Sequence, residues 1–597
     1  MAEHVLVSIA WPYASAKIHV GNVTGSHLPG DIYARYHRLL GHRVLMVSGS
    51  DSHGTPITVR AEEEGKSPRE LFERFHGSFL ELFQRLGISY DLFTHTDTEN
   101  HHRVSQEFFL ALYENGYLYK EAQQQMYSVE QGRFLPDRYV EGTCPNCGYE
   151  GARGDQCDEC NTLLDPEQLI EPRSVLDGSE PVLRETEHYF LDLPTLAREG
   201  LTQWLALNKE HWRPNVINFA RNYVGEGLQG RPITRDLRWG IPVPLGGWEE
   251  KCIYVWFEAV IGYFSASVEW ADNKGCPEAW MDWWYNPGAK TVYFIGKDNI
   301  PFHAVIWPAE LMGVKRLYEK SSSQVFNLPY NVPANEFMNL EGRGMSGSRN
   351  WAVWMDEALD RYHPDALRYY LTAAMPETRD TNWLWDEFVQ RNNKELVGTW
   401  GNLAHRALTF AFRRFDGQVP APEELDELDQ RLLEKSEAAF DSVGQQLAGC
   451  HFRAALGEVM DLAREANRYL DDKGPWFQIK EDREAAGTTI YVVLKAIDSL
   501  KVLFAPFLPF SSQRLHEILG YEGQLFGRQY TETFEEAGGR VHEALCYDPA
   551  PAVGEWQPSH LAPGQVLRQP EPLFETLDES VIEEERARLG MEEACHE

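Results

Sequence analysis

Basic residues are scarce in this sequence relative to acidic ones. Its 597 residues include 56 lysines and arginines against 91 aspartates and glutamates, which gives a formal net charge of −35. Such an excess of negative charge favours solubility and opposes non-specific contact with polyanions. Any nucleic-acid partner would therefore need local basic patches set against a repelling background.

Long apolar runs and cysteines are scarce as well. No run approaches the ~20 apolar residues of a membrane span. The first apolar run, VLVSIA, follows Glu3 and His4 and ends in Trp-Pro, unlike a signal peptide. Only nine cysteines are present, and four of them cluster, which favours a reducing compartment and one metal site over a disulfide framework. We therefore expect a cytoplasmic protein with no membrane partner.

The length allows about three or four domains, and the N-terminal part has an α/β pattern. Residues 3–10 and 43–51 are predicted strands, with a predicted helix at 19–42 between them. Strand-like runs return at residues 252–257 and 291–298, after a polar, irregular stretch. We expect one parallel sheet that is interrupted by an insertion.

The C-terminal part has a helical pattern. Apolar residues recur at spacings of three and four between about 385 and 510, as on one face of a packed helix. The segment from residue 550 on is Pro-rich and then acidic. We expect it to be a tail that lies over another domain.

A candidate nucleotide element lies at residues 10–22, AWPYASAKIHVGN, between a strand and a helix. Such a junction presents unpaired backbone N–H groups and the positive end of the helix dipole, which suits phosphate. His19, Gly21 and Asn22 lie where the helix begins, so His19 can donate to phosphate oxygens and Gly21 permits close approach. The alternative is that His19 only caps the helix and Gly21 eases a turn.

Four cysteines form two C-x-x-C pairs within CPNCGYEGARGDQCDEC, at Cys144, Cys147, Cys157 and Cys160. Each pair brings two thiolates to one side of a metal, and two pairs complete a closed tetrahedral site. With four protein ligands no water position remains open, so this pattern predicts one structural Zn²⁺. Two disulfides or a redox pair suit neither the compartment nor the spacing.

Several ordered blocks resemble one family. PYASAKIHVGN resembles the HIGH motif of class I aminoacyl-tRNA synthetases, and the preceding Ala-Trp-Pro-Tyr resembles the methionyl-tRNA synthetase family. GSDSHGTPI, TRDLRWGIPVP, YVWFEAVIGY, YFIGKDNIPFH and DALRYYL match further blocks of that family. The resemblance covers almost the whole chain. It implies a Rossmann-type catalytic domain that is split by a zinc-binding connective peptide, then a stem-contact fold and an all-α anticodon-binding bundle.

The resemblance also implies domain bounds. We expect the two catalytic halves at 1–118 and 229–325, the connective peptide at 119–228, the stem-contact domain at 326–386, the anticodon-binding domain at 387–550 and the tail at 551–597. A valine, isoleucine or leucine synthetase is disfavoured, because those enzymes carry a large editing insertion and the interrupting segment is too short for it. The chain ends without an appended oligomer-binding domain, so we expect a monomer.

The resemblance places Asp51 on the methionine ammonium and an aromatic wall around the thioether, which packs well against rings. The implied wall residues are Ala10, Trp11, Tyr13, Trp256, Tyr263, His303 and, as an outer residue, Trp307. ATP is expected to contact His19, Gly21, Asn22, Gly296, Asp298, Asn299, Met345 and Gly347. From the residues alone, Trp256 and Tyr263 could equally be core, and Asp51 and Asp298 could be helix caps.

The resemblance implies that Asn402, Arg406 and Trp476 contact the anticodon. Asn402 and Arg406 are four apart on a predicted helix, so they share a face. Single-stranded bases are read by stacking and edge hydrogen bonds, which suits an aromatic with two polar neighbours. On pattern alone, an ordinary bundle helix with a core Trp476 is equally consistent.

The second family signature, KMSKS, has lost both of its lysines. Residues 344–348 read Gly-Met-Ser-Gly-Ser within LEGRGMSGSRN. Losing one electrostatic contact to a transition state commonly costs ~3–4 kcal/mol in enzymes. Three interpretations remain: Arg343 and Arg349 supply the charge while Gly344, Ser346, Gly347 and Ser348 hold phosphate; Mg²⁺ and the His19 region suffice at a reduced rate; or the chain is a weak paralogue that binds tRNA or methionine.

We favour a working enzyme, because the methionine pocket, the zinc cluster and the anticodon residues occur together. The implied reaction joins L-methionine to tRNA(Met), including initiator tRNA, through a methionyl-adenylate made with ATP and Mg²⁺. Positioning and charge neutralisation carry the first step without a general base.

Overall fold

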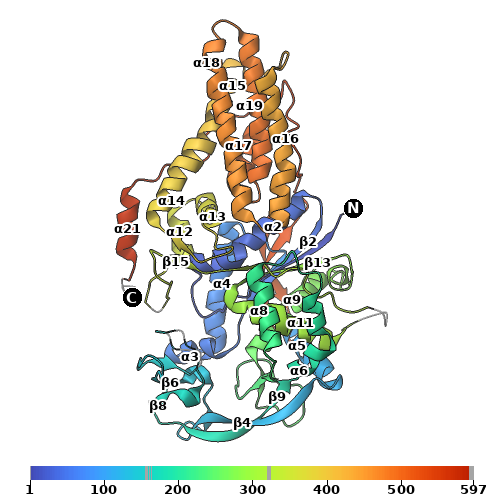
Figure 1. Ribbon diagram of the computed structural model, residues 1–597, viewed down its shortest axis with the longest axis vertical. Helices are drawn as coiled ribbons and strands as arrows, with labels where there is room; N and C mark the ends of the chain where they lie inside the picture. The colour runs from blue at the N-terminus through green and yellow to red at the C-terminus, as the bar shows by residue number, and fades with distance from the viewer. Residues whose placement is uncertain are drawn as a thin grey trace.

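A seven-stranded sheet lies at the centre of the protein, here described from a computed structural model (Figure 1). The structure describes residues 2–590 except 155–156, 158, 161, 163, 319–323 and 348, and it omits the side chain of Asp137. Five neighbouring strands run parallel, in the spatial order β14 (Ala334–Asn335), β13 (Lys290–Gly296), β1 (His4–Ile9), β2 (Arg43–Ser50) and β3 (Leu92–His95). The predicted parallel sheet is therefore confirmed.

The two faces of the sheet belong to two different cores. In β1, Val5 and Val7 join one buried cluster and Leu6 joins the other, as the alternation of a strand requires. On one face the sheet packs with α2 (Leu28–Leu39) and α4 (Pro68–Leu86); on the other it packs with α5 (Glu99–Glu114), α9 (Val255–Asn273), α10 (Met281–Trp284) and α11 (Trp307–Val314). The strands are buried on both faces, as in other parallel sheets.

The insertion forms the end of the molecule that lies farthest from the helical bundle (Figure 1). An antiparallel sheet has the order β10 (Arg231–Pro232), β9 (Val182–Leu191), β4 (Leu118–Ser128) and β5 (Arg133–Phe134). A second sheet has the order β7 (Ala152–Arg153), β6 (Val140–Thr143) and β8 (Ile170–Ser174). Helices α6 (Leu193–Leu196), α7 (Thr202–Ala206) and α8 (Pro214–Gly225) lead back towards the central sheet.

After β14 the chain builds a small linking unit and then the bundle. The linking unit pairs β15 (Met338–Leu340) with β16 (Thr381–Trp383) and adds α12 (Met355–Arg361) and α13 (Pro364–Ala373). The bundle contains α14 (Trp385–Arg391), α15 (Asn402–Arg414), α16 (Glu427–Ala448), α17 (Phe452–Lys473), α18 (Pro475–Gln478), α19 (Arg483–Phe504) and α20 (Pro509–Ile518). The predicted helical region is confirmed. None of the helices in the described residues is long and apolar enough to cross a membrane.

Two secondary-structure predictions were wrong or incomplete. Residues 252–257 are a strand only over β12 (Cys252–Ile253), which pairs with β11 (Thr234–Arg235); from Val255 they begin α9. A short continuous apolar run does not distinguish a buried strand from a buried helix. The hairpin of β17 (Arg528–Glu535) and β18 (Val541–Asp548) was missed, although it lies within the range assigned to the anticodon domain. It extends the central sheet by antiparallel pairing with β3.

The C-terminal tail lies over other domains, as predicted. Trp556 packs between Tyr36 of α2 and Phe440 of α16, with ring centroids 5.0 and 5.3 Å away, and its indole N–H donates to the Phe440 carbonyl at 3.0 Å. The last helix of the described residues is α21 (Ser580–Arg588), which lies beside α14 and α12 (Figure 1). Arg361 of α12 pairs with buried Glu585 of α21 at 2.7 Å.

A buried ion cluster joins the sheet domain, the linking unit and the bundle. Asp31 of α2 is fully buried and accepts from Arg35 at 2.9 Å and from Arg368 of α13 at 2.7 Å. Arg368 also donates to the carbonyl oxygens of Pro506 and Phe507, at the end of α19. Burial raises the pKa of Asp31, but the two arginines and hydrogen bonds from Ser89 outweigh it and lower that pKa to about 2.

We predict that Arg368→Met lowers the free energy of unfolding by about 3–5 kcal/mol, because it leaves buried Asp31 short of a partner. The matched control is Arg85→Met, which breaks a surface pair with Asp360 and should cost less than about 1 kcal/mol. In the wild type the Asp31 contribution is present above pH ~4 and is lost as the pH falls through about 2. In the variant this loss should begin at a higher pH. Denaturant titrations at several pH values measure both effects, and equal costs for the two variants would contradict the assignment.

Candidate active site and metal cluster

His19 caps the helical stretch that follows β1. The ring Nδ1 of His19 accepts from the Gly21 backbone N–H at 3.1 Å. The backbone N–H of His19 donates to Asn22 Oδ1 at 3.1 Å. Burial lowers the pKa of His19 to about 4, so the imidazole is neutral at pH 7. Because Nδ1 is an acceptor, the proton lies on Nε2. His19 therefore caps the helix, and the cap leaves the Nε2–H of the ring as a donor for a ligand.

The glycine- and serine-rich loop lies against this element. The Val20 N–H donates to the Val353 carbonyl at 3.0 Å, and the Met355 N–H donates to the Ile18 carbonyl at 2.9 Å. A Cβ on Gly21 would lie 3.5 Å from Met345 Sδ. The fold therefore brings the two sequence motifs into direct contact.

The loop carries two exposed arginines. Ser346 and Trp351 exchange backbone hydrogen bonds of 2.9 Å, and Arg349 Nε donates to Ser346 Oγ at 3.3 Å. The Arg343 guanidinium lies 5.2 Å from the centre of the Trp351 ring. In the part of the chain that is described, neither arginine pairs with a carboxylate, so both are available to an anion.

The two glycines that replace lysines differ in their surroundings. A Cβ on Gly344 would meet no atom within 4 Å, whereas one on Gly347 would lie 3.3 Å from the Trp354 ring. Gly344 therefore has room for a side chain. Ser348, the last residue of the motif, lies outside the described residues.

An aromatic wall lies beside this element. A Cβ on Gly49 would lie 2.0 Å from the Trp11 indole, and one on Gly262 would lie 2.7 Å from it, so both glycines make room for that ring. The Tyr263 hydroxyl donates to His303 Nε2 at 2.7 Å, since His303 Nδ1 donates to the Asn299 carbonyl at 3.0 Å. Burial lowers the pKa of His303 to about 4 and keeps the ring neutral.

Asp51 follows β2 at the carboxyl edge of the sheet. Its backbone pairs with the strand-end segment: the Asp51 N–H donates to the Pro12 carbonyl at 2.8 Å, and Tyr13 forms a parallel bridge with it. Only 3% of Asp51 is exposed. Burial, followed by the nearby charge of Glu258, raises the pKa of this carboxyl well above its usual range. A cation placed beside Asp51 would therefore be strongly favoured.

Three expected wall residues occupy different layers. The Ala10 N–H donates to the Phe294 carbonyl at 3.0 Å, where β1 ends against β13. Trp256 is 36% exposed and packs on Phe302 at 4.3 Å. Trp307 has no exposed surface and donates to the Tyr293 hydroxyl at 3.0 Å, so it lies in the core behind the wall.

The end of β13 supplies polar groups at the same edge of the sheet. Gly296 is the last residue of the strand, and Asp298 and Asn299 form the turn that follows. A Cβ on Gly296 would lie 2.7 Å from Asp298 Oδ1, so glycine allows that carboxylate to fold back over the strand end. The carboxyl edges of parallel strands are the usual ligand sites of open sheets.

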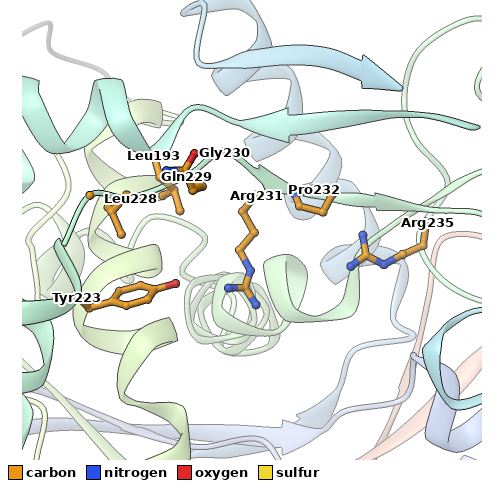
Figure 2. Close-up of a pocket in the computed structure, with 9 residues that line it drawn as sticks. Leu193, Tyr223, Leu228, Gln229, Gly230, Arg231, Pro232 and Arg235 are labelled. Carbon is orange, nitrogen blue, oxygen red and sulfur yellow. The ribbon is translucent and has the colours of Figure 1, made fainter. Parts of the chain in front are cut away.

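A pocket of about 380 Å³ opens next to the wall, between α8 and β10 (Figure 2). Tyr223 and Arg231 project into it, and Arg235 lies at its side. The Arg231 guanidinium lies 5.1 Å from the Phe302 ring, which in turn contacts Trp256. These arginines were not predicted as site residues, although arginines that pair with no carboxylate of the described residues are informative in so acidic a chain.

Two further residues were missed although both lie in blocks that carry the resemblance. His53 Nδ1 donates to Glu258 Oε1 at 2.7 Å, and the His53 backbone N–H donates to Asp51 Oδ1 at 3.3 Å. Both side chains are buried. The sequence gives no sign that His53 and Glu258, which lie 205 positions apart, contact each other in the folded protein.

The three predicted anticodon residues lie near the far end of the bundle, where Figure 1 shows α15 and α18. The Arg406 guanidinium lies 4.8 Å from the Trp476 ring, and exposed Asn402 is one helical turn away. Phe477, which sequence analysis passed over, is 67% exposed. An exposed phenylalanine next to a half-buried tryptophan is a second candidate stacking surface.

The four cysteines converge as the spacing predicts. The Cys144 and Cys160 sulfurs lie 3.8 Å apart, and those of Cys147 and Cys157 lie 3.6 Å apart. All four sulfurs lie within 4.8 Å of one another, and none is in a disulfide. Zn–S bonds of about 2.3 Å give tetrahedral edges of about 3.8 Å. The donor set therefore fits a closed zinc site, and it lies in the small core of the insertion.

We predict that the purified protein carries one zinc ion per chain and that Cys157→Ser loses it, because three thiolates no longer close the tetrahedron. The control is Cys276→Ser, an exposed cysteine outside the cluster. Elemental analysis gives the stoichiometry, and protease digestion of the insertion shows whether the metal stabilises it. Retention of a full zinc equivalent by Cys157→Ser would contradict the assignment.

Comparison with known proteins gives a consistent result along the chain. Residues 5–408 match the family model described as tRNA synthetases class I (M), and residues 419–543 match the anticodon binding domain of methionyl tRNA ligase. The methionine–tRNA ligase of Thermomicrobium roseum is 57% identical over 591 residues, with 99% of each chain covered. That of Roseiflexus castenholzii is 55% identical over 597 residues, again with 99% of each chain covered.

Solved structures show the same architecture. The methionyl-tRNA synthetase of Mycobacterium tuberculosis in complex with methionyl-adenylate has a TM-score of 0.74 and 25% identity, and the match covers 96% of this chain and 100% of that one. The sheet domain, the linking unit and the helical bundle thus belong to one known arrangement. The chain is a member of the methionyl-tRNA synthetase family of class I tRNA synthetases.

Proposed function

We propose that this protein activates L-methionine with ATP and transfers it to tRNA(Met), including initiator tRNA, in the cytoplasm. One observation carries the proposal: buried Asp51 and the Trp11 wall lie at the same sheet edge as His19 and the loop that contacts it. A carboxylate for an ammonium group and donors for phosphate thus face one space. Full-length identity of 57% to a methionine–tRNA ligase supports the same reaction.

Methionine is held by its ammonium and its side chain. Asp51 accepts from the ammonium, and the thioether packs among Trp11, Tyr13, Tyr263 and His303, with Ala10 and Trp256 at the margin. Trp307 supports this wall from behind through Tyr293. The Tyr263–His303 hydrogen bond fixes both rings, so the wall is in place before methionine binds.

ATP binds across the strand ends. We assign the ribose to Gly296, Asp298 and Asn299, and the phosphates to His19 Nε2–H together with Gly21 and Asn22. The loop closes over the phosphates with Met345, Gly344, Gly347 and the Ser346 and Ser348 hydroxyls. Mg²⁺, when bound with ATP, offsets part of the charge on the β- and γ-phosphates.

Adenylate formation then needs positioning and charge stabilisation. A methionine carboxylate oxygen attacks the α-phosphorus, the bond to the β-phosphate oxygen breaks, and pyrophosphate leaves. Arg343 and Arg349 supply cationic character where the family motif has lysines. In the second step a terminal ribose hydroxyl of tRNA attacks the carbonyl carbon, and AMP leaves.

The zinc cluster and the bundle complete the protein. A zinc ion held by Cys144, Cys147, Cys157 and Cys160 would supply only structure, since its four positions are filled by protein. Asn402, Arg406 and Trp476 contact anticodon bases, with Phe477 as a second stacking surface.

The proposal is tested by methionine-dependent ATP–pyrophosphate exchange and by charging of tRNA(Met). The wild type should do both. Trp476→Ala should keep exchange at the wild-type rate and lower kcat/KM for tRNA by about 10-fold or more, since base stacking contributes ~1–3 kcal/mol. Absence of exchange with intact tRNA binding in a gel shift would instead identify a tRNA-binding relative.

We predict that Arg349→Ala lowers the exchange rate by about 10–100-fold without changing tRNA affinity, because it removes charge next to the phosphates. Adding Gly344→Lys to the Arg349→Ala variant should restore part of the lost exchange rate. Position 344 has open space, and the family motif carries lysine there. Presteady-state adenylate formation measures the rate. Equal losses of exchange and tRNA binding, or no rescue by the lysine, would contradict the role of Arg349.

A further inference from the structure

The C-terminal hairpin reaches the neighbourhood of the methionine site. Its turn carries Arg540, which donates to Asp97 Oδ2 at 3.3 Å and to the Asp97 carbonyl at 3.0 Å. Glu536 of the same turn holds the Arg540 guanidinium at 2.7 Å, and the Gly538 N–H donates to Glu99 at 3.1 Å. Several contacts therefore fix where this arginine points.

Asp97, just after β3, is a buried carboxylate with several charged or titratable partners. Only 3% of it is exposed, and besides Arg540 it pairs with Arg69 at 2.6 Å. Its other oxygen faces the rings of two histidines, His53 at 3.6 Å and His102 at 3.4 Å. Burial raises the pKa of Asp97, but His102, His53 and Arg69 outweigh it and hold that pKa well below its usual range.

His53 connects Asp97 to Asp51, the carboxylate that we assign to the methionine ammonium. The ring lies between Glu258 Oε1, at 2.7 Å, and Asp97, while its backbone N–H binds Asp51 at 3.3 Å. Burial lowers the pKa of His53, but Glu258 and Asp97 outweigh it and raise that pKa to about 10. His53 is therefore an imidazolium at neutral pH, and its charge opposes the rise that burial and Glu258 cause in the pKa of Asp51.

We propose that the C-terminal hairpin positions the Asp51 carboxylate for the methionine ammonium through Arg540, Asp97 and His53. Arg540 holds Asp97, and Asp97 and Glu258 hold the His53 ring. The His53 backbone N–H then holds Asp51 in the orientation that an ammonium needs. The inference rests on the proposed function and adds three positioning residues to it. None of the three has to touch substrate.

Charged and titratable groups from several elements surround Asp51, His53 and Asp97. Asp51 faces Tyr13, Glu258 and His53, and His53 faces Glu258, Asp97, His95, His101 and His102. His101 also hydrogen-bonds Glu258, at 3.2 Å. Three buried carboxylates are thus offset by His53, Arg69 and Arg540. Removing any of these three cations should raise the pKa of Asp51.

The test measures KM for methionine, KM for ATP and the pH dependence of kcat/KM for methionine in exchange. His53→Gln and Arg540→Met should raise KM for methionine by about tenfold and about threefold, with KM for ATP nearly unchanged. The acid limb of the pH profile should move up by about one pH unit in His53→Gln, so the variant recovers as the pH rises. A purely structural role would not give that recovery.

Two matched variants sharpen the result. Arg540→Lys keeps the charge and should remain within twofold of the wild type. Arg528→Met removes an exposed arginine from β17 of the same hairpin and should change nothing. Unchanged KM and pH profiles in Arg540→Met and His53→Gln would overturn the inference, as would equal rises in both KM values.

Methionine binding by calorimetry separates this inference from the proposed function. A wild type that binds methionine but shows no exchange would refute the function, and the dissociation constants of the variants would still decide the positioning role. A wild type that neither binds methionine nor shows exchange would overturn both.

Discussion

The buried pair of Asp31 and Arg368 is the contact on which the arrangement of the protein depends. It ties the first helix after the nucleotide motif to α13 and, through the carbonyl oxygens of Pro506 and Phe507, to the end of α19. The same face of the sheet, α13 and the bundle helices also share one apolar core. Because packed cores resist deformation, the distance between the anticodon residues and the sheet edge is fixed by packing rather than by a flexible link.

Cations have different partners on the surface and near the site of this chain, whose net charge is −35. In the described residues many surface cations, such as Arg60, Arg74 and Arg133, pair with carboxylates. Arg343, Arg349 and Arg231 instead lie on aromatic rings or hydroxyls near the site. Inside the site the carboxylates are buried, and their negative charge is offset by His53, Arg69 and Arg540. Under the proposed function, methionine and ATP would be bound by a few desolvated groups, which act strongly at low dielectric.

The parts of the fold that sequence analysis predicted depend on local pattern. Strands β1 and β2, the helix between them and the long bundle helices follow hydrophobic periodicity, and the zinc cluster follows the spacing of Cys144 to Cys160. The start of α9 was assigned wrongly because a short apolar run fits either structure. The β17–β18 hairpin was missed because its partner, β3, lies more than 400 residues earlier, and pairing at that separation leaves no local signal.

The sequence by itself determined the family, through ordered motifs, and the four cysteines of the candidate zinc cluster, through their spacing. Only the tertiary structure decided which groups meet: Met345 against Gly21, Trp11 between Gly49 and Gly262, and Arg540 against Asp97. It also showed that His19 caps its helix through Nδ1, which leaves the Nε2–H without a partner among the described residues. Contacts between distant residues are set by the packing of whole elements, and no stretch of sequence encodes them alone.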